Sequence, residues 1–502
     1  MALLKSLFKD TALYGLPSIV GRFLNYLLVI LYTDVMPASS GEYGIVTNLY
    51  AYTALIMVIL TFGMETTLFR FVNKKEENPM HVYSTALITV GGLSLGFLAL
   101  ILVFLQPLSS ALGYAEHPEY LAIMALIVAV DAFACIPFVY LRYLQKAKKF
   151  ACLKMLNIII NIALNLFVFV VCPKINAVHP ELIAWFYDSD YMAGYVFAIN
   201  LITSLVTLLM LFKEWMPGRQ FRASDGTTST FKYVWDAPLF HRMFKYSYPI
   251  LILGIAGILN QTLDKIIYKF LIPGDAGTQQ LGIYGACFRI AMIMAMFTQA
   301  FRFAYEPIIF NKSKDKKDVV TTNALGMKYF IIVSLFGFLA VMAWIDLLKV
   351  IILRNPGYWE GLGVVPVVMA AEIMMGIYFN LSFWYKLIDQ TLWGALFSII
   401  GCIVLVLINV LFVPQYGYMA CAWAGLAGYS TCMLLSYFVG QRKNPIPYDL
   451  RSISCYTLLA VALYVGMLFI PDTWGYWAIA VKTLFVLLYA AYFCWKELLP
   501  RR

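Results

Sequence analysis

The chain has 502 residues, of which 62% are hydrophobic and only 13% are charged, and its net charge is +10. A soluble domain averages about 45–50% apolar and about 25% charged residues, so this composition excludes a set of water-soluble domains. Disorder is excluded too, because disordered chains are poor in apolar residues. A nucleic-acid partner would need a basic face on a soluble module, and no soluble stretch is long enough to form one. The composition therefore predicts a polytopic membrane protein without a nucleic-acid partner.

A membrane-spanning helix needs about 20 mostly apolar residues. Fourteen stretches meet this requirement, near 11–33, 44–63, 82–106, 119–141, 153–172, 191–212, 246–271, 283–306, 322–345, 362–385, 392–413, 419–439, 452–470 and 475–495. The first is longer than the apolar part of a signal peptide and has no clear small-residue cleavage site, so we expect it to be retained. The prediction is an all-α polytopic membrane protein with about 14 transmembrane helices.

Lysine and arginine concentrate in alternate segments between these helices. If the N-terminus is cytoplasmic, the inner segments hold most of them, including the group Lys146, Lys148, Lys149 and Lys154, whereas the outer segments hold only Lys174, Lys349 and Arg354. Such an excess marks the cytoplasmic loops of membrane proteins. The pattern predicts that both termini are cytoplasmic, and it explains most of the positive net charge without a substrate.

The longest polar stretch, Lys213–Lys245, divides the helices into six and eight and is too short for a catalytic domain. We therefore predict an N-terminal six-helix bundle at 1–212, a cytoplasmic linker at 213–245, a second six-helix bundle at 246–439, and two further helices with a cytoplasmic tail at 440–502. No enzymatic activity is expected.

The two halves repeat short patterns in the same order. These are Tyr14-Gly15-Leu16-Pro17 with Tyr246-Ser247-Tyr248-Pro249, Gly41-Glu42-Tyr43-Gly44 with Gly282-Ile283-Tyr284-Gly285, and Phe69-Arg70-Phe71 with Phe301-Arg302-Phe303. Both copies enter the membrane from the same side, which indicates a parallel duplication. Such repeats are typical of transporters, with a substrate site between the halves near the midplane.

These patterns, together with Phe62-Gly63-Met64-Glu65, Leu263-Asp264-Lys265 and Glu306-Pro307, resemble the polysaccharide flippases of the multidrug/oligosaccharidyl-lipid/polysaccharide exporter superfamily. The resemblance implies two pseudo-symmetric six-helix bundles in a V shape with two outer C-terminal helices, which in the lipid II flippase branch form a lipid-tail groove. It implies alternating-access transport of undecaprenyl-diphosphate-linked oligosaccharides to the outer leaflet of the bacterial inner membrane, for O-antigen or exopolysaccharide synthesis. Membrane lipids, a polysaccharide polymerase and a chain-length regulator are the partners it suggests.

Three cations lie deep enough in the expected helices to hold a lipid diphosphate, for which the arginine fork is suited. Arg22 lies near the midplane, and Lys265 and Arg289 each lie about 9 Å below the outer surface, where they are expected to meet. The alternatives are an ion pair between Arg22 and Asp131, and snorkelling of the other two to the interface. Asp264 is expected to point away from Lys265, because adjacent helical residues do not face each other.

Asp131 and Glu372 are the acids nearest the midplane and are candidates for coupling to protons or sodium, with helix–helix pairing as the alternative. On the fifth expected helix, Asn157, Asn161 and Asn165 share one face. They are expected either to bind sugar hydroxyls or to form interhelical hydrogen bonds.

No metal site is expected, because the cysteines form no CxxC pair and the histidines are isolated. No cofactor is expected beyond a coupling ion. Two related functions stay open: a multidrug cation antiporter, disfavoured by the excess of deep cations, and a lipid II flippase, which carries several cavity arginines in its first two helices where this chain has only Arg22. A membrane glycosyltransferase or polymerase is disfavoured, because the longest outer segment, Pro173–Asp190, is short.

Overall fold

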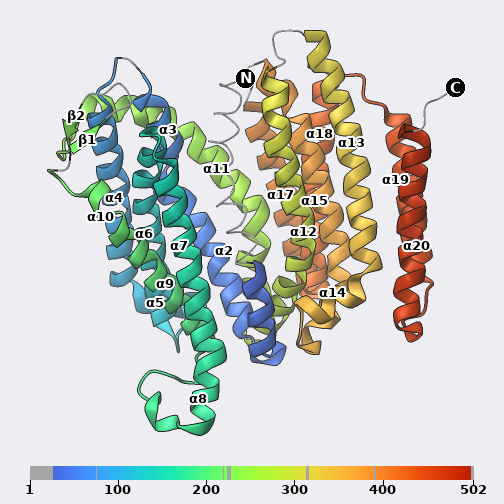
Figure 1. The fold of residues 1–502 in the computed structure, drawn as a ribbon, viewed down its shortest axis with the longest axis horizontal. Coiled ribbons are helices and arrows are strands. Elements are labelled where there is room, and N and C mark those ends of the chain that lie inside the picture. Colours follow the sequence, from blue (N-terminus) through green and yellow to red (C-terminus); the bar gives the residue numbers. More distant parts are fainter. Residues whose placement is uncertain are drawn as a thin grey trace. The chain divides into compact units, whose positions relative to one another are not determined.

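The computed structural model describes residues 26–74, 76–218, 220–222, 228–311, 316–388, 390 and 392–498. Arg22 lies outside these residues, so its expected role remains a prediction. In the described part, regular structure is helical apart from one two-stranded hairpin (Figure 1). The predicted all-α membrane fold is thereby confirmed.

Thirteen helical segments of the described chain are long and apolar enough to cross a membrane. They are Glu42–Val72, Pro79–Val103, Pro118–Tyr143, Ala147–Val178, Met192–Met210, Ala237–Leu271, Asp275–Arg302, Val320–Ala343, Pro356–Lys386, Leu392–Tyr416, Tyr418–Lys443, Leu450–Leu468 and Tyr476–Glu497. The shorter apolar helix Tyr26–Val35 is the described end of the first expected stretch. Apolar patterning locates these helices because backbone groups in lipid must bond within the helix.

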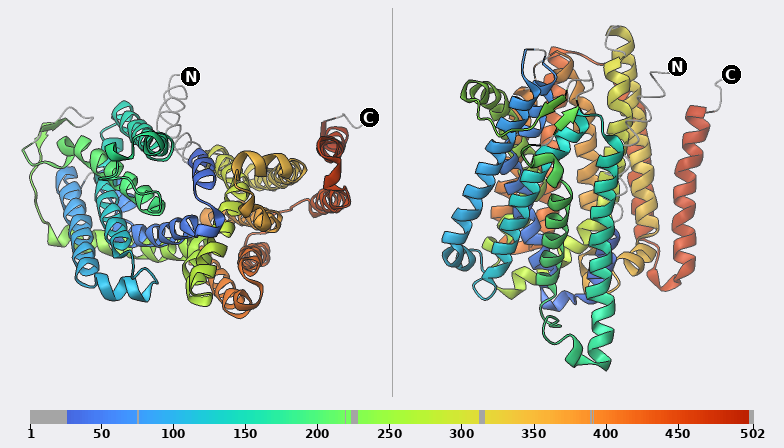
Figure 2. Two further views of the ribbon diagram at one scale, coloured as in Figure 1. Left: turned by 90° about the horizontal axis from the view of Figure 1, so that it is seen from below. Right: turned by 60° about the vertical axis from the view of Figure 1, so that its left-hand side comes forward.

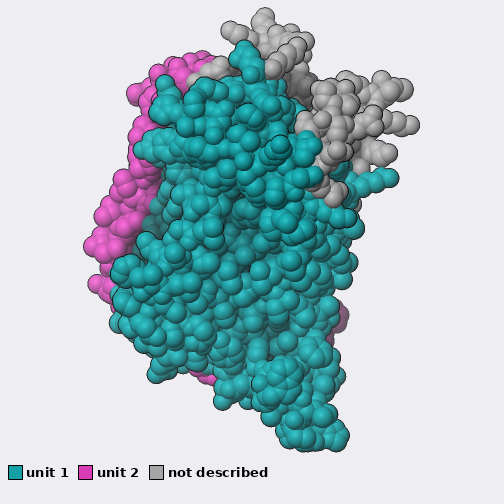
Figure 3. All heavy atoms as spheres, turned by 90° about the vertical axis from the view of Figure 1, so that its left-hand side faces the viewer, with its two compact units in different colours: residues 1–36, 40–279 teal, residues 37–39, 280–502 magenta. Residues whose placement is uncertain are grey.

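Contacts divide the chain into two compact units, which Figure 3 shows in different colours. Unit 1 consists of residues 1–36 and 40–279, and unit 2 of residues 37–39 and 280–502. We describe each unit by itself. The boundaries expected at 213, 246 and 440 rest on the sequence repeat and stay a prediction.

Unit 1 is arranged around one buried helix, α6. Its helices are α2 (Glu42–Thr61), α3 (Met64–Val72), α4 (Pro79–Val103), α5 (Leu105–Ala111), α6 (Pro118–Tyr143), α7 (Ala147–Leu166), α8 (Cys172–Val178), α9 (Met192–Met210), α10 (Phe212–Trp215) and α11 (Ala237–Leu271). Helix α6 packs against α2, α3, α4 and α9. A π-helical turn at Phe167–Val171 joins α7 to α8, which projects beyond the neighbouring helix ends (Figures 1 and 2).

The second spanning helix is broken between α2 and α3. Phe62 and Gly63 both adopt left-handed backbone conformations, with φ of 51° and 65°. A Cβ atom on Gly63 would lie 3.1 Å from Ile250 Cγ2 and 3.2 Å from the carbonyl oxygen of Ser247, both on α11. Glycine suits this break for two reasons. It adopts the left-handed conformation at little cost, and it has no Cβ that would collide with α11. The break places Glu65 in the first turn of α3.

The expected linker is partly ordered. Strands β1 (Gln220–Arg222) and β2 (Thr228–Thr230) pair antiparallel. The backbone N–H of Leu239 then donates to the Asp236 carboxylate, which caps α11. Arg242 Nη2 lies 3.0 Å from both carboxylate oxygens of Glu77, so the start of α11 is tied to the loop before α4.

Unit 2 contains the remaining spanning helices. They and their short neighbours are α12 (Asp275–Asn311), α13 (Lys316–Ala343), α14 (Ile345–Ile352), α15 (Val364–Leu381), α16 (Phe383–Leu387), α17 (Leu392–Tyr416), α18 (Tyr418–Lys443), α19 (Leu450–Leu468) and α20 (Tyr476–Phe493). Helix α18 packs against both α15 and α17, whereas α19 and α20 pack on α13.

The C-terminal helices α19 and α20 are joined to the helix α13 and its extension by ion pairs at both ends. At one end Lys328 Nζ lies 2.8 Å from Glu497 Oε1 and 3.5 Å from Asp449 Oδ2. At the other end Lys482 Nζ lies 3.0 Å from Asp346 Oδ2. Lys328 and Lys482 are nearly buried, so losing either ion pair would be costly. The two ion pairs therefore fix the position of helices α19 and α20 along α13.

Candidate functional site

The expected asparagine face of α7 lies against α9. Asn157 Nδ2 donates to Thr207 Oγ1 at 2.7 Å, and Asn161 Nδ2 donates to Asn200 Oδ1 at 2.9 Å. Asn200 in turn donates to the hydroxyl of Tyr50 on α2. These bonds connect α7, α9 and α2 through polar side chains within the membrane-spanning part of unit 1.

Asn165 extends this network toward the end of the first helix. Its side chain is fully buried and donates to the carbonyl oxygen of Asn161 at 2.8 Å, while its Oδ1 accepts from the Tyr32 hydroxyl at 2.8 Å. The interhelical bonding left open by the sequence is therefore present. Sugar binding stays a prediction, and it would require a glycan hydroxyl to exchange with one of these bonds.

A second cluster surrounds Asp131, near the middle of α6. Its carboxylate lies close enough to Ser204 on α9 and to the ammonium group of Lys154 on α7 to interact with both electrostatically. Lys154 also interacts electrostatically with Glu65 on α3, which lies near Cys135, one turn after Asp131 on α6. Helices α3, α6 and α7 thus contribute two carboxylates and one lysine to one group.

Lys154, which the sequence analysis counts among the cytoplasmic charges, is a residue of helix α7 with an exposed side chain. It lies about 10 Å inside α7, because this helix begins at Ala147 rather than near residue 153. Its Nζ is 4.2 Å from the ring centroid of Phe138. With all three groups ionised, the cluster has a net charge of −1. Binding of a proton or a sodium ion would neutralise this charge. The ion-coupling role of Asp131 itself stays a prediction.

Lys265 on α11 forms a local ion pair, contrary to expectation. Its Nζ lies 3.1 and 3.2 Å from the carboxylate oxygens of the adjacent Asp264, and both residues are buried. The prediction that Asp264 points away was wrong because it considered Cβ directions alone, and the long lysine chain curls back. Nζ also donates to the carbonyl oxygen of Gln261 at 3.2 Å. A diphosphate would therefore compete with Asp264 for this cation.

The other two expected site residues lie in unit 2. Arg289 on α12 is half-buried, with Nη1 3.8 Å from Met292 Sδ. Glu372 is half-buried on α15. Since Lys265 belongs to unit 1, its expected meeting with Arg289 stays a prediction, as do the binding and coupling roles of all these residues.

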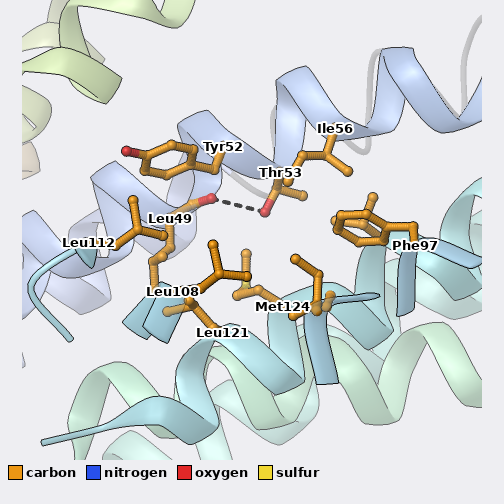
Figure 4. A pocket seen from close by; sticks show the side chains of 12 residues that line it. Leu49, Tyr52, Thr53, Ile56, Phe97, Leu108, Leu112, Leu121 and Met124 are labelled. Atoms are coloured by element: carbon orange, nitrogen blue, oxygen red, sulfur yellow. Dashed lines mark hydrogen bonds between the residues drawn. The ribbon is translucent and has the colours of Figure 1, made fainter. Parts of the chain in front are cut away.

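Unit 1 also contains an apolar pocket of about 80 Å³. Figure 4 shows that side chains of α2 and α6 face each other across it, with Phe97 of α4 at one side. Its twelve lining residues are Leu49, Tyr52, Thr53, Ile56, Phe97, Ile101, Leu108, Leu112, Leu121, Met124, Ala125 and Val128. None of the expected binding residues lines it, so it does not form part of the polar network.

Several charged residues with clear structural partners were not expected from the sequence. They are Glu65 and Lys154 in unit 1, and Lys328, Asp346, Lys482 and Glu497 in unit 2. The available signal was their location within or at the ends of apolar helices, where charges are costly and usually paired. Among the described residues, no group of three or more histidine, cysteine, aspartate or glutamate side chains is placed to hold a metal ion.

Comparison with known proteins identifies the family. Residues 7–311 match the family model described as polysaccharide biosynthesis protein. The chain belongs to this family. The resemblance predicted from the sequence motifs is therefore confirmed, and the protein is a multi-pass membrane protein of the polysaccharide biosynthesis family. A comparison with curated protein sequences finds no match.

Solved transporters share the fold of this family member. The lipid II flippase MurJ in its inward closed conformation has a TM-score of 0.73 and 12% identity, covering 97% of this chain and 100% of its own. An inward-facing multidrug resistance MATE family transporter of the MOP superfamily has a TM-score of 0.63 and 12% identity, covering 86% and 97%. The MATE multidrug transporter DinF-BH has a TM-score of 0.59 and 16% identity, covering 87% and 96%. At these identities the likeness shows a common fold.

Proposed function

We propose that this protein is a flippase that moves undecaprenyl-diphosphate-linked oligosaccharide repeat units from the inner to the outer leaflet for surface polysaccharide synthesis. The family match supports a role in polysaccharide biosynthesis. The observation that carries the flippase assignment is the extent of the fold likeness. MurJ covers 97% of the chain, so the unmatched part is too short to contain α19 or α20, whereas the MATE transporter leaves 14% unmatched.

The substrate has three parts with different requirements. The diphosphate needs fixed cations, for which Arg22, Lys265 and Arg289 are the candidates. The glycan needs hydrogen-bonding groups in a hydrated space, and the amides of Asn157 and Asn161 are proposed for this role. The isoprenoid tail stays in the bilayer while alternating access carries the head group across.

The proposed energy source is an ion gradient acting at intramembrane acids. Asp131 is the leading candidate, because it shares Lys154 with Glu65 and the cluster can accept one further positive charge. Glu372 is the candidate in unit 2. The proposed setting is the bacterial plasma membrane, with both termini cytoplasmic and with a polysaccharide polymerase and a chain-length regulator acting on the product.

The test is a deletion strain assayed for surface polysaccharide and for the sidedness of lipid-linked repeat units. We expect loss of the polysaccharide and accumulation of repeat units in the inner leaflet, both restored by the wild-type gene. Normal polysaccharide with increased sensitivity to cationic dyes would contradict the proposal and support a multidrug antiporter. Accumulated lipid II with normal repeat-unit transport would instead support a lipid II flippase.

A further inference from the structure

One sequence pattern of unit 1 takes no part in the polar clusters described above. Phe69-Arg70-Phe71, which has a counterpart in the second half, ends the second spanning helix. Arg70 lies in the last turn of α3, and Lys74 follows two residues after this helix. Both residues are exposed. The pattern therefore places cations next to aromatic rings at one end of a membrane-spanning helix.

These two cations lie over a pair of neighbouring rings. The Arg70 guanidinium carbon is 4.3 Å from the ring centroid of Tyr246 on α11, and Lys74 Nζ is 4.1 Å from that of Phe71. The two ring centroids are 6.0 Å apart. Because a cation is attracted to the face of an aromatic ring, the two rings hold both positive charges at the junction of α3 and α11.

A third cation reaches the same place from α6, which packs against α3. Arg142 lies in the last turn of α6, and its guanidinium carbon is 5.6 Å from the ring centroid of Phe69. Phe69 is the residue before Arg70, and it is 44% exposed. We call this group of cations and rings the basic–aromatic patch. It consists of Phe69, Arg70, Phe71, Lys74, Arg142 and Tyr246.

No carboxylate in the described part of the chain neutralises the basic–aromatic patch. Its three cations form no ion pair and no side-chain hydrogen bond with a described residue. By contrast, Arg242 is paired with Glu77 and Lys149 with Glu214 at the same end of unit 1. The patch therefore has three positive charges and a set of N–H donors that are available to an anion.

Helix lengths place the patch at the depth of the lipid head groups. Arg70 lies about 40 Å along α2 and α3 from Glu42, and Tyr246 lies about 38 Å from the end of α11 at Leu271. Both distances exceed the roughly 30 Å thickness of the hydrocarbon core. The patch is on the side that the charge pattern predicts to be cytoplasmic, where the phosphates of the inner leaflet lie.

We propose that the basic–aromatic patch binds the phosphate of an anionic phospholipid of the cytoplasmic leaflet. The forks of Arg70 and Arg142 fit phosphate oxygens, and Lys74 adds a third charge. A zwitterionic lipid is disfavoured, because its ammonium group would meet three cations. The bound lipid would connect α3, α6 and α11 beyond the helix break at Gly63. The inference does not depend on which substrate the protein transports.

The test is native mass spectrometry of the full chain in detergent, titrated with phosphatidylglycerol and, separately, with phosphatidylcholine of the same acyl chains. We expect stoichiometric binding of one phosphatidylglycerol and weaker binding of phosphatidylcholine. Arg70→Gln should weaken the binding of phosphatidylglycerol about fivefold, since one cation near the head groups is lost. Arg70→Lys keeps the charge without the fork and should fall between Arg70→Gln and the wild type. Phe69→Leu keeps every charge but removes the ring under Arg142, and it should weaken binding about twofold.

The matched controls lie at the same end of unit 1. Lys148→Gln removes an exposed cation near the start of α7 that contacts no described ring. Phe212→Leu removes a ring from α10 that is 43% exposed and has no described cation over it. Both controls should bind phosphatidylglycerol as the wild type does. Melting temperatures close to that of the wild type show that each variant is folded.

Equal affinity for the two phospholipids would overturn the proposal, as would unchanged affinity in both Arg70→Gln and Phe69→Leu. The same loss in Lys148→Gln as in Arg70→Gln would also overturn it, because the total charge of this end would then explain the binding. Displacement of phosphatidylglycerol by inorganic phosphate at the same concentration would reject a lipid in favour of a free anion.

Discussion

Asp346 Oδ2 lies 3.0 Å from Lys482 Nζ. This contact joins α14 to α20 in unit 2, although the two residues are 136 positions apart in the chain. The other carboxylate oxygen, Oδ1, is 2.7 Å from Lys349 Nζ. Asp346 thus holds two lysines at the end of α13 where α14 begins. Lys482 is the more buried of the two, with 8% of its side chain exposed against 22% for Lys349.

Removing the acid should destabilise unit 2 more than removing either lysine. Asp346→Asn removes the carboxylate that both lysines contact and should lower the free energy of unfolding by about 3 kcal/mol. Lys482→Met should cost less, because Lys349 still compensates Asp346, and Lys349→Met should cost least. Thermal unfolding of the purified variants in detergent measures the order. An equal effect of all three substitutions would show that the pairing contributes little.

The same carboxylate should make stability depend on pH in acid. Burial raises the pKa of Asp346, but the hydrogen bonds from Lys349 and Lys482 outweigh it and hold the pKa below the usual 3.8. A depressed pKa adds stability above the unfolded value, and this is lost as pH falls through the folded value. The melting temperature of the wild type should therefore fall relative to Asp346→Asn below about pH 4. Parallel curves for the two proteins would contradict the assignment.

The break in the second spanning helix should tolerate only glycine at its centre. Gly63→Ala introduces a Cβ in a left-handed conformation and against α11, which should cost about 1–2 kcal/mol and impair transport. Gly92→Ala on α4 is the matched control, because a Cβ there meets nothing within 4 Å. It should stabilise the helix by up to about 1 kcal/mol. Similar melting temperatures for the two variants would rule out strain at the break.

The cluster of Asp131, Lys154 and Glu65 gives a prediction about ion coupling. Asp131→Asn removes the excess negative charge and should abolish the dependence of transport on a proton or sodium gradient. Lys154→Met leaves two carboxylates without a cation and should lower the melting temperature, and adding Asp131→Asn should partly restore stability but not transport. Transport into vesicles with imposed gradients is the assay. Full ion dependence in Asp131→Asn would remove this residue from the coupling site.

Arg22, which lies outside the described residues, remains the strongest single candidate for diphosphate binding. Arg22→Ala should abolish complementation of the deletion strain while membrane levels stay normal. Lys174→Ala, in an outer segment, is the control and should complement fully. A fully active Arg22→Ala protein would exclude Arg22 from the site.

The sequence was sufficient for the fold but not for its charge pairs. Hydropathy located the spanning helices of the described chain because lipid leaves backbone groups no partner outside the helix. The sign of a loop charge, however, does not say where a helix begins. Helix α7, for example, starts six residues earlier than expected, and Lys154 lies in its third turn.

Side-chain length and chain separation explain the other differences. The Lys265–Asp264 pair depends on how far four methylene groups can bend, which Cβ periodicity does not describe. Pairs such as Lys482–Asp346 join helices that are distant in the sequence, and no local pattern links them. The asparagine face of α7 was visible as a spacing, but its partners on α9 required the packing of the bundle.

The pairing of Lys328 with Glu497 has a consequence for biosynthesis. A ribosome completes α13 long before it reaches the anion that neutralises this lysine, because the two residues are 169 positions apart. Asp449 caps the start of α19 and Glu497 follows α20, so we expect Lys328 to lack both acids until these helices have been made and inserted. Release of a chain truncated after α18 would leave this defect permanent and expose the fragment to membrane proteases. We therefore expect insertion of α19 and α20 to be the step that completes the charge pairing of unit 2.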